Sequence, residues 1–112
     1  MKSYAQALDL KSDPAIIAKY KEYHRNVWPE VKQSLREIGI ESMEIFLLGN
    51  HLFMYYTAGD DFDPQRDFQA YTEKSPRAKE WNDLMSTFQQ KVPEASPADW
   101  WAPMELVFDL RW

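Results

Sequence analysis

The sequence predicts an α+β fold in which a ferredoxin-like antiparallel sheet carries helices on one face. The first observation is the order of hydrophobic periods, which runs strand, helix, strand, strand, helix, strand, as in a split βαβ arrangement. The second is the length, since 112 residues make one domain, 1–112, and leave no room for another. Hydrophobic residues make up 45% of the chain, so we expect a packed core.

The first third of the chain predicts one strand and a broken helix. Residues 4–10 form a short mixed run that ends at a polar stretch, which is typical of a strand followed by a break. Asp13 is a natural N-cap with a proline behind it, and the apolar spacing that follows predicts a helix from about 14 to 26. Pro29 cannot donate its backbone hydrogen bond, so the helix should kink or restart there and continue to Gly39.

The middle of the chain predicts a β-hairpin. Residues 40–48 and 52–58 are two apolar runs separated by Gly49-Asn50, the composition of a tight turn. We therefore expect these two strands to pair antiparallel.

The last third predicts two helices and a terminal strand. Asp63 and Ser75 are each followed by proline, which repeats the helix-start signal. The expected helices hold Phe68 and Tyr71 in the first and Trp81, Leu84, Met85 and Phe88 in the second. After the proline-rich loop 93–103, the alternation over 104–110 predicts a closing strand.

The predicted strands supply apolar side chains to both faces of the sheet. These include Phe46, Leu48, Phe53, Met54, Tyr55 and Leu106. Because the helices cover one face only, we expect the other to meet a second copy of the sheet. The sequence therefore predicts a homodimer.

Charge and composition exclude several classes of function. Thirteen Lys and Arg against eighteen Asp and Glu give a net charge of −5, which argues against nucleic acid and anionic membranes as partners. An RNA-binding module shares the element order, but residues 51–56 lack the basic and glycine positions of its signature. No window approaches 18 apolar residues, and a reducing cytoplasm fits a chain without cysteine.

The residue types also argue against a metal site and against thiolate chemistry. Without cysteine there is no thiolate nucleophile or iron–sulfur ligand, and two separated histidines do not make a zinc site. The acidic run 60–63 lacks the glycine and the distal glutamate of a calcium loop. We interpret it as a solvated turn and a helix cap.

His24 is the candidate for proton transfer. Helical spacing places its imidazole beside the Tyr20 ring on an apolar stripe, whereas His51 follows the hairpin turn and should be exposed. His24 is either a half-buried histidine satisfied by a backbone carbonyl or a proton donor and acceptor in an aromatic pocket. Flat rings that could stack on a sugar come from Trp28, Trp81, Trp100 and Trp101. Glu44 and Glu105 are second-rank carboxylate candidates.

The block Tyr20-x3-His24-x3-Trp28-Pro29-Glu30 resembles the L-rhamnose mutarotase family, including its relatives linked with L-fucose. The resemblance runs over nearly the whole chain. Further matches are Gly39, Met43-Glu44-Ile45-Phe46, Asn50-x-Leu52-Phe53, Trp81-x3-Met85 and Met104-Glu105-x2-Phe108. The resemblance implies a dimeric α+β barrel that interconverts the anomers of a 6-deoxy-L-hexose without metal or cofactor.

The resemblance also implies roles for single residues. His24 matches the family's proton donor, and Tyr20 matches a substrate-binding tyrosine. Trp81 and Asn82 fall where the rhamnose enzymes carry a Trp-Trp pair that binds the sugar, and Met43 stands where they carry a tyrosine. These departures leave L-rhamnose and L-fucose both open as the sugar, and the Met43-Glu44 pair is more similar to the fucose-linked branch.

Mutarotation suits these residues chemically, because it needs only proton transfer at the anomeric hydroxyl and the ring oxygen. Two other classes of function use the same features. One is another dimeric α+β barrel enzyme, such as a small monooxygenase, which predicts a coloured ligand or oxygen uptake. The other is a non-catalytic sugar-binding module, in which His24 only forms hydrogen bonds.

Overall fold

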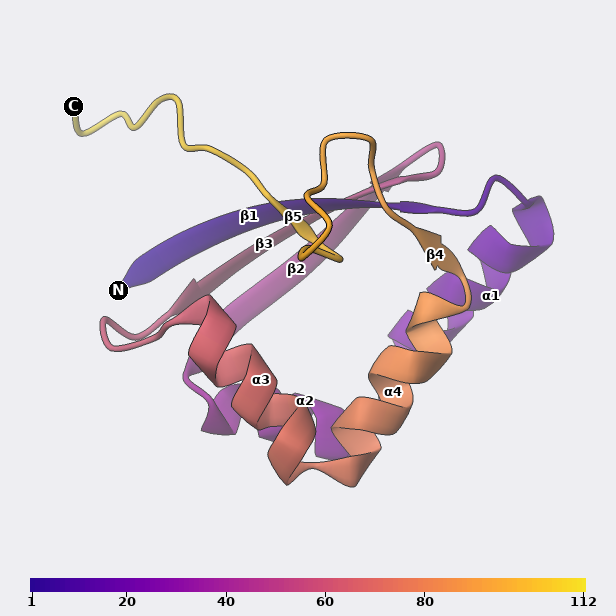
Figure 1. Cartoon of the computed structure of the whole chain (residues 1–112), viewed down its shortest axis with the longest axis horizontal. Helices are drawn as coiled ribbons and strands as arrows, with labels where there is room; N and C mark the ends of the chain where they lie inside the picture. The colour runs from indigo at the N-terminus through magenta and orange to yellow at the C-terminus, as the bar shows by residue number, and fades with distance from the viewer.

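A computed structural model describes all residues 1–112 and has the predicted α+β fold. Its elements are β1 (Lys2–Leu10), α1 (Pro14–Arg25), α2 (Pro29–Glu37), β2 (Ile40–Leu48), β3 (His51–Ala58), α3 (Pro64–Lys74), α4 (Pro76–Ser86), β4 (Gln89–Gln90) and β5 (Ala102–Pro103). The antiparallel sheet has the order β2-β3-β1-β4, and β5 also pairs with β1. All four helices lie on one side of this sheet (Figure 1). None of them is long and apolar enough to cross a bilayer.

The helices begin where the sequence predicts. The side chains of Asp13, Asp63 and Ser75 each accept a hydrogen bond from a backbone N–H of the first helical turn. Each cap satisfies a donor that would otherwise have no partner within the helix. At Pro29 the chain restarts as α2 rather than bending, and its N-cap residue Trp28 forms no side-chain cap.

The predicted hairpin is confirmed. Gly49-Asn50 joins β2 to β3, and Leu48 lies opposite His51 in the antiparallel register. Gly49 has a φ of +61°, a left-handed conformation that glycine adopts without strain. Alternate residues of β3 then face the helices and are buried: Leu52, Met54, Tyr56 and Ala58.

The core lies between the sheet and the helices in two neighbouring clusters. The larger contains Leu10, Tyr20, Val31, Leu52, Tyr71, Ala78, Trp81, Met85 and Phe88, and the smaller contains Ile40, Met54, Tyr56, Ala58 and Phe62. Tyr20 and Trp81, two candidate site residues, are therefore fixed by the packing that stabilises the domain.

The predicted strand over 104–110 is wrong. Met104 donates its backbone N–H to Ala5 at 2.8 Å, and the chain then leaves the sheet without further strand pairing (Figure 1). An alternating pattern forms a strand only beside a neighbour with free backbone groups. On the edge of β1 away from β3, β4 pairs with Asp9 and Leu10 and β5 with Gln6 and Ala7, but the tail turns away before it reaches residues 2–4. Glu105 consequently lies in this tail and not in a strand.

Phe88 also lies outside its predicted helix. α4 ends at Ser86, with Thr87 as its C-cap, and Phe88 follows in a turn. The ring nevertheless remains in the larger core cluster. Apolar spacing cannot distinguish these two situations, because both place the side chain in the same core.

The sheet face away from the helices carries exposed rings and aliphatic groups, as predicted. Phe46 is 54% exposed, Leu48 80%, Phe53 37% and Tyr55 38%. Met54 belongs to the other face, since it faces the helices and is buried. The tail beyond β5 adds Leu106, Val107, Phe108, Leu110 and Trp112, all exposed.

Candidate active site

A cavity of about 940 Å³ lies between the helices and the sheet. Its lining includes five residues that the sequence predicts for the site: Tyr20 and His24 from α1, Met43 from β2, and Trp81 and Asn82 from α4. Trp100 and Trp101, from the loop between β4 and β5, complete part of its wall. The cavity is within the size range of small-molecule sites.

The His24 imidazole is held in one tautomer. Its Nδ1 lies 3.0 Å from the backbone oxygen of Tyr20, and a carbonyl oxygen only accepts. Nδ1 therefore carries the hydrogen, and in the neutral ring Nε2 keeps its lone pair. The ring stacks on Tyr20 at 4.2 Å and meets the edge of Trp81 at 5.3 Å. His24 is thus satisfied by a backbone carbonyl and also lies among aromatic rings, while its role in proton transfer stays a prediction.

Burial sets the charge state of this pair. Desolvation lowers the pKa of His24 below its usual 6.5, although the hydrogen bond to the Tyr20 carbonyl opposes the shift. Desolvation also raises the pKa of Tyr20 to about 12, partly offset by a hydrogen bond from Gln89. At neutral pH the site therefore presents a neutral imidazole with a free Nε2 and a protonated phenol.

Trp28 supports the site without lining it. Its ring meets Trp81 edge to face at 5.1 Å, and the Arg77 guanidinium lies 3.8 Å above its centroid. Arg77 is in turn paired with Glu80 and lies 3.6 Å from Glu30. Trp28 thus packs against Trp81 and helps to hold it in position. The predicted stacking of Trp28 on a ligand is not supported, because its ring lies under Arg77 and outside the cavity lining.

The remaining candidates divide between the two faces of the sheet. Met43 faces the helices and packs against the smaller core cluster, while Asn82 is exposed at the rim of the cavity. Glu44 lies opposite Tyr55 on the exposed face, so the structure does not bring its carboxylate to the cavity. The alternation of β2 forces this separation, because neighbouring strand residues point to opposite faces.

Sequence reasoning missed Gln89. This side chain is 6% exposed, lines the cavity, accepts a hydrogen bond from Trp100 Nε1 at 2.8 Å and donates to the Tyr20 hydroxyl at 3.4 Å. Gln89 and Gln90 follow the helix as a pair of glutamines, and nothing in the sequence marks one of them as buried. Its role could be recognised only from its burial, and that burial depends on the pairing of β4 with β1.

His51 is an exposed hairpin residue, as predicted. Its side chain is 68% exposed, and its Nδ1 lies 2.8 Å from Asp9, a residue on the neighbouring strand β1. Because Asp9, like its partner His51, faces away from the helices, the pair lies on the far side of the sheet from the cavity.

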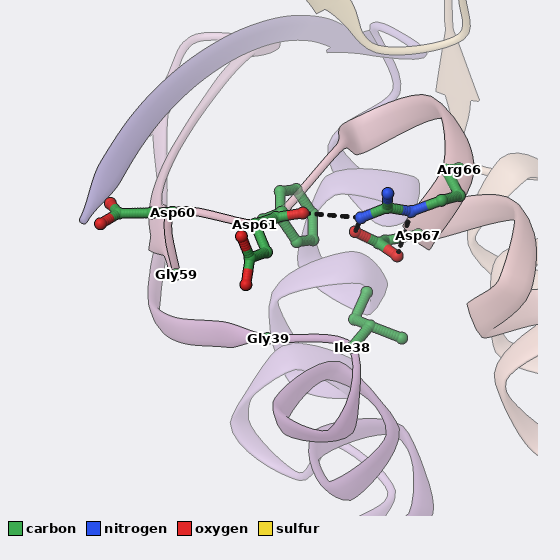
Figure 2. A pocket seen from close by; sticks show the side chains of 8 residues that line it. Ile38, Gly39, Gly59, Asp60, Asp61, Arg66 and Asp67 are labelled. Carbon is green, nitrogen blue, oxygen red and sulfur yellow. Dashed lines mark hydrogen bonds and ion pairs between the residues drawn. The ribbon is translucent and has the colours of Figure 1, made fainter.

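A smaller hollow of about 220 Å³ lies near the ends of β2 and β3, beside Gly39 and Gly59 (Figure 2). The predicted solvated turn and cap at 60–63 are confirmed here. Arg66 bridges the backbone oxygen of Asp61 and the carboxylate of Asp67. This guanidinium lowers the pKa of Asp67. Arg66 and Asp67 therefore satisfy each other within the hollow, whereas Asp60 pairs with the N-terminus outside it.

The chain is similar to known proteins over nearly its whole length. Residues 3–110 match the family model described as L-rhamnose mutarotase. The chain is 60% identical to a UPF0734 protein of Dictyostelium discoideum over 99% of this chain and 91% of the relative. It is 39% identical to an L-fucose mutarotase of Xanthomonas campestris over 98% and 89%.

A solved structure shows the same fold. The crystal structure of an L-rhamnose mutarotase from Formosa agariphila superposes with a TM-score of 0.71 at 28% identity, covering 98% of this chain and 99% of that one. With a family model that spans almost every residue, the chain belongs to the L-rhamnose mutarotase family.

Proposed function

We propose that this protein is a mutarotase that interconverts the α and β anomers of a 6-deoxy-L-hexose, L-fucose or L-rhamnose, without metal or cofactor. The observation that carries the proposal is the geometry of His24. Its Nδ1–H is committed to a backbone carbonyl, so the free Nε2 is available for proton transfer among Tyr20, Trp81 and Trp100. Family membership supports a sugar substrate.

The mechanism needs one base that works twice. Nε2 of His24 accepts the proton of the anomeric hydroxyl while the bond between C1 and the ring oxygen breaks. The imidazolium returns a proton to the former ring oxygen, which becomes the C5 hydroxyl of the open aldehyde. Rotation about C1–C2 and the reverse steps close the ring on the other face. Both oxygens are bonded to C1 in the closed ring, so one imidazole serves both transfers.

This mechanism refines the predicted proton-donor role of His24. A neutral imidazole with a lowered pKa is first an acceptor and becomes a donor only after it has taken the substrate's proton. Tyr20, whose pKa is about 12, remains a hydrogen-bond donor throughout. The flat walls of Trp81 and Trp100 suit the C–H face of a deoxysugar.

The test of the proposed function is anomeric exchange measured by one-dimensional NMR saturation transfer, with L-fucose and L-rhamnose in parallel. We expect faster exchange than in buffer for at least one of the two sugars. A general acid–base catalyst of this kind contributes about 10²- to 10⁴-fold. Exchange at the buffer rate with both sugars, together with sugar binding, would instead identify a non-catalytic binding module.

The exchange rate should fall in acid. Because the pKa of His24 lies below 6.5 in the folded protein, Nε2 is free at about pH 7 and becomes protonated as the pH drops through that lowered value. We expect a level rate from about pH 7 to 8 and a decline on the acid side, after the spontaneous rate in buffer is subtracted. A rate that rises towards acid would contradict the role of Nε2 as a base.

We also propose that the protein is a homodimer formed through the exposed sheet face. Phe46 and Phe53 are cross-strand partners whose rings lie 6.1 Å apart, and the apolar tail beyond β5 lies beside this face (Figure 1). An exposed apolar surface of this kind marks an interface. The expected cytoplasmic location stays a prediction.

Light scattering after size exclusion should give twice the chain mass of 13.3 kDa. Phe46→Lys places a charge beside Phe53 on the exposed face and should shift the protein towards monomer. Gln69→Lys, on the exposed surface of α3, adds the same charge as a control and should leave the mass unchanged. A wild-type protein that stays at 13.3 kDa at all concentrations would refute the dimer.

A further inference from the structure

Two hydrogen bonds connect the loop 91–101 to Tyr20. Trp100 Nε1 donates to Gln89 Oε1 at 2.8 Å, and Gln89 Nε2 donates to the Tyr20 hydroxyl at 3.4 Å. All three side chains line the cavity. Gln89 is 6% exposed and Tyr20 3%, so little water competes for these groups.

Donor and acceptor chemistry fixes which group donates and which accepts in these two hydrogen bonds. An indole N–H only donates, so the Gln89 oxygen must face Trp100 and its NH₂ must face Tyr20. The Tyr20 oxygen then accepts from Gln89, and the hydroxyl hydrogen has to turn away from it, towards the cavity that Tyr20 lines. Without Gln89 the hydroxyl would be free to turn either way.

We propose that Gln89, oriented by Trp100, is a positioning residue that makes the Tyr20 hydroxyl a hydrogen-bond donor to an oxygen of the sugar. The inference rests on the proposed function, since it assigns Tyr20 a substrate oxygen as its acceptor. A donor whose direction is set before the substrate arrives needs no reorientation during the reaction.

These two hydrogen bonds make the direction of the Tyr20 hydroxyl depend on the loop 91–101. The loop's other side-chain hydrogen bonds are internal, from Lys91 to the oxygens of Ser96 and Pro97 and from Ser96 to Asp99. The hydrogen bond from Trp100 to Gln89 is therefore the one that joins a side chain of this loop to β4. When Trp100 moves away, the Gln89 amide can rotate, and Tyr20 loses its fixed direction.

The test reverses the polarity of Gln89. In Gln89→Glu a carboxylate faces Tyr20 as an acceptor, so it draws the hydroxyl hydrogen away from the cavity. We expect kcat/KM for anomeric exchange to fall about 10- to 100-fold, the cost of leaving a polar contact unmade. Gln90→Leu, the exposed neighbour on β4, should leave the rate unchanged.

A double-mutant cycle separates positioning from a structural role. In a Tyr20→Phe background there is no hydroxyl to orient, so Gln89→Glu should change kcat/KM by less than about twofold. An equal loss in both backgrounds would overturn the proposal, because it would show that Gln89 acts through the fold alone. Wild-type kcat/KM in Gln89→Glu would overturn it as well.

A measurement without sugar keeps this inference separate from the proposed function. The indole N–H signal of Trp100 in a ¹H–¹⁵N spectrum, assigned by its loss in Trp100→Phe, should shift in Gln89→Leu and stay in place in Gln90→Leu. An unmoved signal in Gln89→Leu would overturn the hydrogen-bond chain whatever the sugar assays give. If neither sugar exchanges in the wild type, the proposed function fails, and the cycle is measured on sugar affinity, where additivity overturns the positioning role.

Discussion

Replacing His24 by alanine should abolish the catalysed exchange and leave the protein folded. His24 supplies the imidazole that lines the cavity, and its Nε2 is free to act as the base. The neighbouring Tyr20 phenol has a pKa of about 12 and cannot replace it as a base at neutral pH. The expected loss is about 10²- to 10⁴-fold in the catalysed rate of the preferred sugar. Saturation transfer on wild type and variant at equal concentrations measures it.

Two further variants complete this experiment. His24→Gln keeps the bulk and polarity of the side chain but does not titrate, so it should be as inactive as His24→Ala. His51→Ala removes the other histidine, which lies on the far side of the sheet, and should keep the wild-type rate. Residual activity in His24→Gln close to wild type would show that proton transfer passes through another group.

Trp81→Ala should be the most destabilising change in the site. Trp81 is 6% exposed, and its ring meets Tyr23, His24 and Trp28 edge to face, so its removal leaves a large cavity inside the larger core cluster. Substitutions of this kind cost about 3–5 kcal/mol of unfolding free energy. Urea denaturation at a fixed protein concentration measures the change.

Trp81→Phe separates packing from contact with the sugar. The smaller ring retains part of the edge-to-face packing against His24 and Trp28, so the loss of unfolding free energy should be clearly smaller than in Trp81→Ala. A change below about 1 kcal/mol in Trp81→Ala would contradict the dual role of this residue as core and cavity wall.

Local signals predicted most of the fold because the elements depend on neighbours in sequence. Asp13, Asp63 and Ser75 specify helix starts through contacts two or three residues away, and Gly49-Asn50 specifies its hairpin in the same way. The strand predicted at 104–110 failed because the chain leaves β1 after Met104, and whether it stays paired depends on its path over the sheet. That is a property of the whole sheet.

The candidate site was predictable where one helix carries it. The step from Tyr20 to His24 is a single helical turn, so the sequence places the two rings together directly. Gln89 comes 69 positions after Tyr20 and reaches it only through the sheet. Trp28 was assigned to the ligand because its spacing fits, whereas its ring is covered by the Arg77 guanidinium and packs edge to face with Trp81.

The central position of β1 has a consequence for synthesis. β1 leaves the ribosome before every strand that pairs with it, since those partners begin at His51, Gln89 and Ala102. Its fully buried Leu8 and Leu10 thus have no neighbouring strand until β3 has emerged. Folding must wait for contacts of long sequence separation, which slows it and leaves an apolar segment exposed in the nascent chain. For this small protein, chaperone demand is greatest before the last residues emerge.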